Sequence, residues 1–64
     1  MNVPENINDY LHDKGISKSH VARRTGIPNA RFSMLTNGKT KMTLDEYIAI
    51  CDALGVKVTE FIKN

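Results

Sequence analysis

Between residues 29 and 37, small and hydrogen-bonding side chains recur at spacings that one face of a helix brings together. When Phe32 and Leu35 point inward, steps of 100° place these residues on or beside the outer face: Asn29, Ala30, Ser33, Met34 and Asn37. The amide of Asn29 can form two hydrogen bonds with adenine, and the Ser33 hydroxyl can donate or accept one. Ala30 and Met34 can contact thymine methyl groups. The pattern therefore predicts a surface that reads base edges in the DNA major groove, with a rotated helix that buries Met34 as the alternative.

Positive charge surrounds this predicted face. Residues 14–44 contain seven Lys and Arg residues and no Asp or Glu, whereas residues 1–13 contain three acids and no Lys or Arg. Such a block favours a polyanionic partner, the alternative being a solvated basic surface. The residues expected to lie along DNA phosphates are Ser17, Lys18, Arg31, Asn37, Lys39, Thr40 and Lys41. We therefore expect double-stranded DNA as the partner.

Residues that support catalysis or metal binding are few. His12 and His20 fall on different predicted helices, and the single cysteine, Cys51, lies on an apolar stripe. They are too few for a metal site, and no histidine is placed to activate Cys51. The sequence also has no phosphate-binding loop and no pair of carboxylates in a pocket. We therefore expect no enzyme activity, no cofactor and no small-molecule ligand.

Length and composition indicate one small domain that spans residues 1–64. Apolar residues make up 41% of the 64 residues, which suits a compact fold with a small core. One cysteine excludes an internal disulfide, and no apolar run approaches the roughly 20 residues needed to cross a membrane. Glu5 and Asp9 near the N-terminus do not fit a signal peptide. We expect no membrane contact and a cytoplasmic location.

Hydrophobic periodicity predicts an all-α fold, a compact bundle of five short helices. The expected helices span about residues 4–14, 18–25, 28–37, 44–54 and 59–63. Ser17 is a suitable N-cap for the second helix, and Thr43 with Glu46 matches a capping box before the fourth. The third helix can begin with Pro28 as its first residue or with Asn29 as its cap.

The second and third helices together predict a helix-turn-helix unit over about residues 17–37. Ala22 is small where the third helix crosses the second, Gly26 makes the turn, and Ile27 fills the corner. The apolar stripe expected on the fourth helix consists of Leu44, Tyr47, Ile48, Cys51 and Leu54. Phe61 and Ile62 are expected to pack onto the core from the fifth helix.

The order and spacing of these motifs resemble a known family. The stretches "GISKSHVARRTGIPNARFSMLTNGKTK" and "LDEYIAICDALGV" are similar to the Cro/CI-type (XRE-like) helix-turn-helix domain of phage repressors and bacterial regulators, a lambda-repressor-like fold. The resemblance covers about residues 7–62. It implies a five-helix bundle that binds a palindromic operator as a homodimer and acts as a transcriptional repressor. The recognition helix is then the third, about residues 28–37.

The resemblance also implies particular roles. Base reading falls on Asn29, Ala30 and Met34, with Ser33 beside them, and the loop over residues 39–41 follows the DNA backbone. A dimer interface is implied around Val56, Val58 and Phe61. At position 18 the family often has Gln, where this chain has Lys18. At position 20 it often has Glu or Gln, where this chain has His20. The alternative function is a protein-interaction module on the same fold, such as an antitoxin or anti-repressor.

Overall fold

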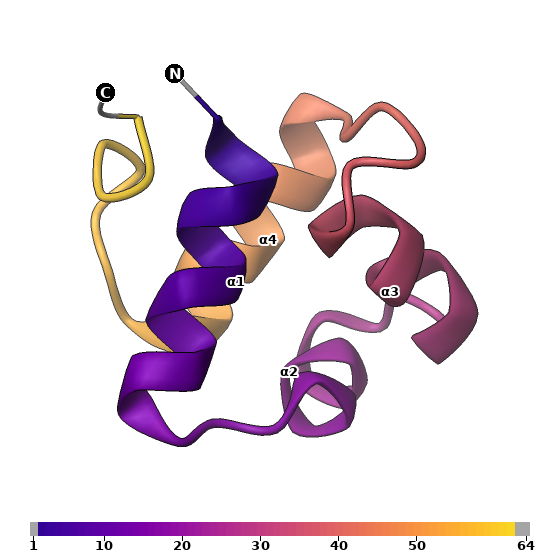
Figure 1. Ribbon diagram of the computed structural model, residues 1–64, viewed down its shortest axis with the longest axis horizontal. Coiled ribbons are helices and arrows are strands. Elements are labelled where there is room, and N and C mark those ends of the chain that lie inside the picture. Colours follow the sequence, from indigo (N-terminus) through magenta and orange to yellow (C-terminus); the bar gives the residue numbers. More distant parts are fainter. Residues whose placement is uncertain (1, 63–64) are drawn as a thin grey trace.

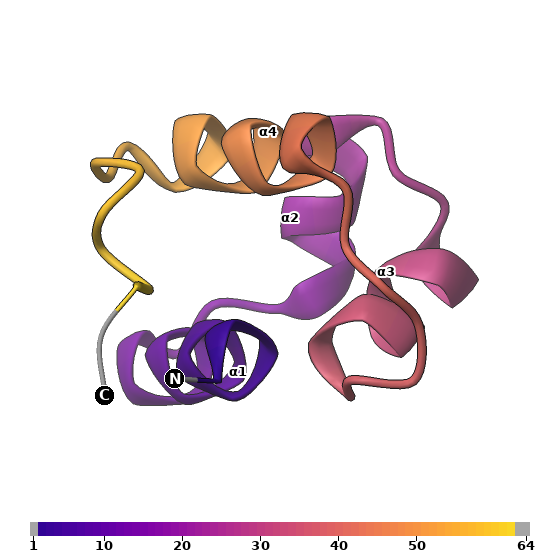
Figure 2. The same ribbon diagram turned by 90° about the horizontal axis from the view of Figure 1, so that it is seen from above.

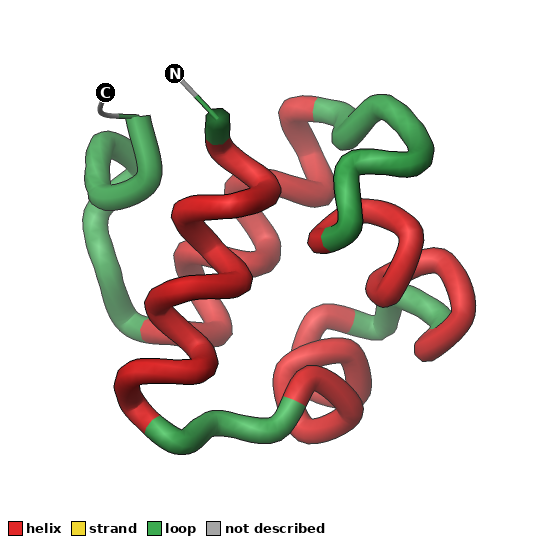
Figure 3. The backbone as a smooth tube through the Cα atoms, in the orientation of Figure 1, coloured by secondary structure: helices red, strands yellow, loops and turns green. Residues whose placement is uncertain are grey.

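The computed structural model describes residues 2–62, and within this range the chain is all-α, with four helices and no strand (Figures 1 and 3). The helices are α1 (Val3–Lys14), α2 (Lys18–Thr25), α3 (Asn29–Thr36) and α4 (Leu44–Leu54). The predicted all-α class is therefore confirmed. The predicted count of five helices is wrong, because the expected helix at 59–63 is replaced by turns over residues 58–61. Lys63, the last residue of that expected helix, lies outside the described residues.

Short-range hydrogen bonds explain where α2 and α4 begin. The Ser17 hydroxyl accepts from the amide of His20 at 3.0 Å, so Ser17 caps α2 as predicted. At α4 the full capping box is present: Thr43 Oγ1 accepts from the Glu46 amide at 3.1 Å, and Glu46 Oε1 accepts from the Thr43 amide at 2.9 Å. The predicted boundaries of these two helices are confirmed.

The helices surround one core. α2 packs against both α3 and α4, and α1 packs against α3. Seen from above, α1 and α4 lie on opposite sides, with α3 at one end and the C-terminal segment at the other (Figure 2). The buried apolar side chains are Ile7, Leu11, Val21, Ala22, Phe32, Leu35, Tyr47, Ile50, Cys51 and Phe61. Thus α3 is held at the edge of the molecule by its packing against α2 and α1.

The C-terminal segment is held by side chains instead of by a fifth helix. The Tyr47 hydroxyl donates to the Val58 carbonyl, and Asn6 Nδ2 donates to the Phe61 carbonyl at 2.9 Å. The Phe61 ring meets the rings of Tyr10 and Tyr47 edge-on, with centroids 5.4 and 6.5 Å away. Side chains of α1 and α4 thus donate hydrogen bonds to backbone carbonyls of this segment and hold it in a turn conformation. Phe61 packs into the core as predicted.

Two residues of the apolar stripe predicted on α4 do not face the core. Tyr47 and Cys51 are buried, but Leu44 and Ile48 are 71% and 45% exposed. Ile50, which the predicted stripe omits, is fully buried. The helix has apolar residues on both sides, so packing against α2 decides which side faces the core. Ile62 is likewise 50% exposed, so the prediction that it packs onto the core is wrong.

Candidate nucleic-acid interface

The corner between α2 and α3 fixes the direction of α3. Val21 and Ala22 are each 1% exposed, so α3 and α4 lie close against this part of α2. Gly26 has φ = 80°, a conformation that side chains disfavour. A Cβ atom at Gly26 would meet nothing within 4 Å, so the backbone angle, not crowding, requires glycine. Thr25 Oγ1 then accepts from the Ile27 amide at 3.1 Å and stabilises the exit from the turn.

The face of α3 away from the core is the predicted one. Phe32, Leu35 and Thr36 are buried. The exposed residues are Asn29, Ala30, Ser33, Met34 and Asn37. Met34 is 43% exposed, so the rotated helix that would bury it is wrong. The sequence pattern did not assign Thr36 to the core; its hydroxyl donates to the Phe32 carbonyl at 3.2 Å and is thereby satisfied inside the fold.

The first residue of α3 has a side chain that the fold does not use. Pro28 occupies the N-cap position and Asn29 is the first helical residue, so both predicted starts are one position off. No side chain caps the helix. Within residues 2–62, the side-chain amide of Asn29 takes part in no hydrogen bond. A hydrogen-bonding side chain is therefore held at the exposed end of a helix with its donors and acceptor available to another molecule.

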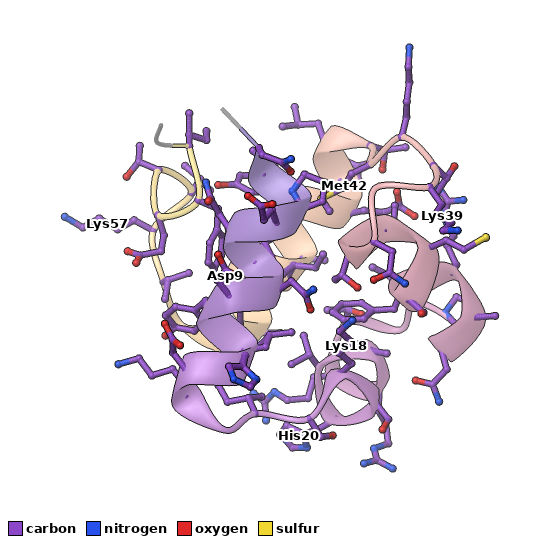
Figure 4. The ribbon with its side chains drawn as sticks, in the orientation of Figure 1. Asp9, Lys18, His20, Lys39, Met42 and Lys57 are labelled. Carbon is purple, nitrogen blue, oxygen red and sulfur yellow. The ribbon has the colours of Figure 1, made fainter. Side chains whose placement is uncertain are left out.

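The predicted phosphate contacts lie at the start of α2 and in the loop after α3. Lys39 and Lys41 are exposed, whereas Lys18 and Thr40 are half-buried. Figure 4 shows Lys39 beside α3, and Lys18 and His20 on α2. The Lys39 amide donates to the Met34 carbonyl at 2.9 Å, which fixes the loop on the end of α3. Cations thus lie at both ends of the helix-turn-helix unit.

Three of the predicted site residues also make local hydrogen bonds, and the sequence indicated only that of Ser17. Asn37 Nδ2 donates to Ser33 Oγ at 3.4 Å, so these two side chains of the exposed face lie together. The Ser17 hydroxyl is already used as the α2 cap, although the residue is exposed.

Arg31 differs from the other predicted phosphate contacts. Its Nε donates to Glu46 Oε2 at 2.5 Å and its Nη2 donates to Oε1 at 3.1 Å. The Arg31 hydrogen bonds, followed by the Thr43 amide, lower the Glu46 pKa to about 2. The pair also raises the pKa of Arg31. Sequence reasoning assigned Glu46 only to the cap, because no local pattern links residues 15 positions apart.

The remaining reactive groups are parts of the core. Burial raises the pKa of the Cys51 thiol and of the Tyr47 hydroxyl, so neither group is activated at neutral pH. Among residues 2–62, no three His, Cys, Asp or Glu side chains lie close enough together to hold a metal ion. No helix in this range has the length and apolar character needed to span a membrane.

Two short helices joined at a glycine corner, with an exposed hydrogen-bonding face on the second and lysines around it, define a helix-turn-helix DNA-binding domain. The family model of the Cro/C1-type HTH DNA-binding domain matches residues 6–63. The chain belongs to this family, which confirms the resemblance found in the sequence. No curated protein and no solved structure matches the chain. Family membership makes the chain a DNA-binding transcription regulator, a class that is typically non-enzymatic.

Proposed function

We propose that this chain is a sequence-specific repressor that binds a palindromic operator as a homodimer. The observation that carries the proposal is the exposed face of α3, where the side-chain amide of Asn29 makes no hydrogen bond within residues 2–62. Asn29 and Ser33 supply hydrogen bonds to base edges, and Ala30 and Met34 supply apolar contacts. Lys18, Lys39 and Lys41, with Ser17, Asn37 and Thr40, are the proposed contacts to the DNA backbone.

A dimer follows from the small size of this surface. A few base contacts from one α3 give weak specificity, and two-fold symmetry doubles them over half-sites about 34 Å apart. The molecule is 27 Å long, with α3 at one end and the C-terminal segment at the other (Figure 1). Half-sites at this spacing require each α3 to lie about 17 Å from the two-fold axis, with the two copies joined on the side away from α3.

The proposed interface needs one change from the sequence prediction. Val58 is 49% exposed and Val56 is half-buried, so both have surface to offer a second copy. Phe61 is 1% exposed and its ring is already packed against Tyr10 and Tyr47. We therefore assign the interface to Val56 and Val58. Phe61 belongs to the core beneath them.

Selection of bound sites from random duplex DNA tests the proposal. A repressor of this kind should enrich a palindrome, and sedimentation should give two subunits for each selected site. Val58→Glu should reduce this ratio to one and weaken binding. Enrichment of a single asymmetric half-site, with one subunit bound, would contradict the homodimer.

A protein-interaction module, such as an antitoxin or anti-repressor, is the second candidate. The observation that favours it is Met34, an apolar side chain 43% exposed next to Ala30 on the same face of α3. Salt dependence separates the two functions. Affinity for DNA falls steeply with salt because counterions are released, whereas an apolar protein contact responds weakly. A cytoplasmic location is part of either proposal.

A further inference from the structure

One ion pair joins α3 and α4, two helices that pack little against each other directly. α2 lies against both α3 and α4, and direct packing between α3 and α4 is slight. Arg31 on α3 and Glu46 on α4 bridge this gap with two hydrogen bonds, of 2.5 and 3.1 Å. Bidentate arginine–carboxylate pairs fix direction as well as distance. The rotation of α3 about its own axis is thus coupled to the start of α4.

Glu46 performs two tasks with one carboxylate. Oε1 accepts from both the Thr43 amide and Arg31 Nη2, while Oε2 accepts from Arg31 Nε. The Glu46 side chain is 17% exposed and the Arg31 side chain 38% exposed, so the carboxylate is the more enclosed partner. Because the capping box immobilises Glu46, the carboxylate is a fixed anchor for the arginine.

The pair also changes the charge that α3 presents. Arg31 follows Ala30 and lies two positions before Ser33, within the proposed DNA-reading helix. Its guanidinium is neutralised by a carboxylate and is directed toward α4. The exposed lysines of the following loop, Lys39 and Lys41, have no ion pair among residues 2–62. Arg31 is therefore unlike the lysines, although the sequence predicts the same role for all three.

We propose that Glu46 is a positioning residue for DNA recognition: it withholds Arg31 from the phosphates and orients α3 against α4 for the preferred site. This inference rests on the proposed function and deepens it. It predicts that removal of the pair reduces the preference for the selected site over random DNA without the loss of a phosphate contact. The first test is titration of both DNAs at several salt concentrations.

Three forms of the protein separate the possible roles of Arg31. Glu46→Gln should free the arginine, raise affinity for random DNA and steepen the slope of log K against log salt by about 1. The glutamine side chain of this variant retains an oxygen that can accept from the Thr43 amide, so the α4 cap survives. The double variant Arg31→Gln/Glu46→Gln removes both charges. It should have the wild-type slope on random DNA and a reduced affinity for the preferred site only.

Two results would overturn the proposal. If Arg31 already contacts a phosphate in the wild-type complex, Glu46→Gln leaves the slope unchanged and the double variant reduces it by about 1. If the pair has no positioning role, the double variant keeps the full preference for the selected site. Asp9→Asn, at an exposed carboxylate on α1, is the control for the loss of one negative charge in Glu46→Gln. Melting by circular dichroism verifies that each variant is folded, and Figure 4 shows where Asp9 lies.

A measurement on the free protein distinguishes failure of this inference from failure of the proposed function. In NMR spectra, the Nε–H of Arg31 should exchange with water more slowly than that of Arg24, which is exposed and has no ion pair among the described residues. Glu46→Gln should abolish the difference. If the Arg31 Nε–H exchanges slowly but the protein binds no DNA, the proposed function fails and the coupling of α3 to α4 stands. Equal exchange of both arginines in the wild type would overturn the coupling itself.

Discussion

The hydroxyl of Tyr47, in the first turn of α4, donates a hydrogen bond to the backbone carbonyl of Val58, beyond the end of the same helix. Tyr47 is 7% exposed and its ring also meets Phe61 edge-on. One side chain therefore holds the C-terminal segment by a polar and an aromatic contact. Since Val58 is in the proposed dimer interface, this bond connects the core of the monomer to the surface that a second copy would meet.

Tyr47→Phe tests the polar half of this contact. The variant keeps the ring but removes the donor to the Val58 carbonyl, so the free energy of unfolding should fall by about 1 kcal/mol. Urea unfolding followed by circular dichroism measures it. Tyr10→Phe is the matched control, because the Tyr10 hydroxyl forms no hydrogen bond within residues 2–62. Equal effects of the two substitutions would show that the Val58 bond contributes nothing to stability.

The same substitution at two alanines should have opposite consequences. Ala22 is 1% exposed where α2 meets its neighbours, so Ala22→Leu should cost roughly 1–3 kcal/mol of stability by overpacking. Ala30 is exposed on α3, so Ala30→Leu should change stability by less than about 0.5 kcal/mol and weaken binding to the preferred DNA site. Thermal melting and DNA titration of both variants check this. An unchanged melting temperature for Ala22→Leu would mean that the helix crossing has been misplaced.

The Arg31–Glu46 pair should make stability depend on pH in the acid range. The Glu46 pKa lies at about 2 in the folded protein, against an ordinary value of 4.5. A lowered carboxyl pKa contributes stability that is complete above about pH 4.5 and is lost as the pH falls toward 2. The difference in melting temperature between wild type and Glu46→Gln should therefore shrink over this range. Asp9→Asn, at an exposed carboxylate on α1, controls for the change in net charge. A difference that stays constant with pH would contradict the pairing of Glu46 in solution.

The sequence was sufficient for the parts of the fold that are set by local interactions. The capping box at Thr43 and the Ser17 cap depend on residues three positions apart, and both were predicted. The exposed face of α3 followed from the inward direction of Phe32 and Leu35. In each case the decisive residues are neighbours along the chain, which is where helix geometry makes sequence informative.

Long-range contacts decided the rest. Periodicity placed Ile48 in the core instead of Ile50, because α4 has apolar residues on two sides and only the position of α2 selects between them. The fifth helix was expected because no local signal shows that Tyr47 binds the Val58 carbonyl. Arg31 was assigned to DNA phosphates for its charge, but a partner 15 residues away holds it.

Recognition by Asn29 and positioning by the loop lysines differ in how they respond to DNA sequence and to salt. Lys39→Ala/Lys41→Ala should weaken preferred and random DNA about equally and reduce the slope of log K against log salt by roughly 1 for each lost contact. Lys57→Ala, at the other end of the molecule from Lys39, should leave that slope nearly unchanged (Figure 4). A Lys57 effect as large as that of Lys39 would mean that the DNA does not lie along the α3 loop.

The most direct test of DNA reading by α3 is the affinity of Asn29→Ala for the preferred site and for random DNA, titrated side by side at several salt concentrations. Asn29 is exposed at the start of α3 and its side chain is not used to cap the helix. The substitution should cost about 1–3 kcal/mol on the preferred site and little on random DNA, with the salt slope nearly unchanged. Equal weakening on both DNAs, or no change on either, would contradict base reading through Asn29.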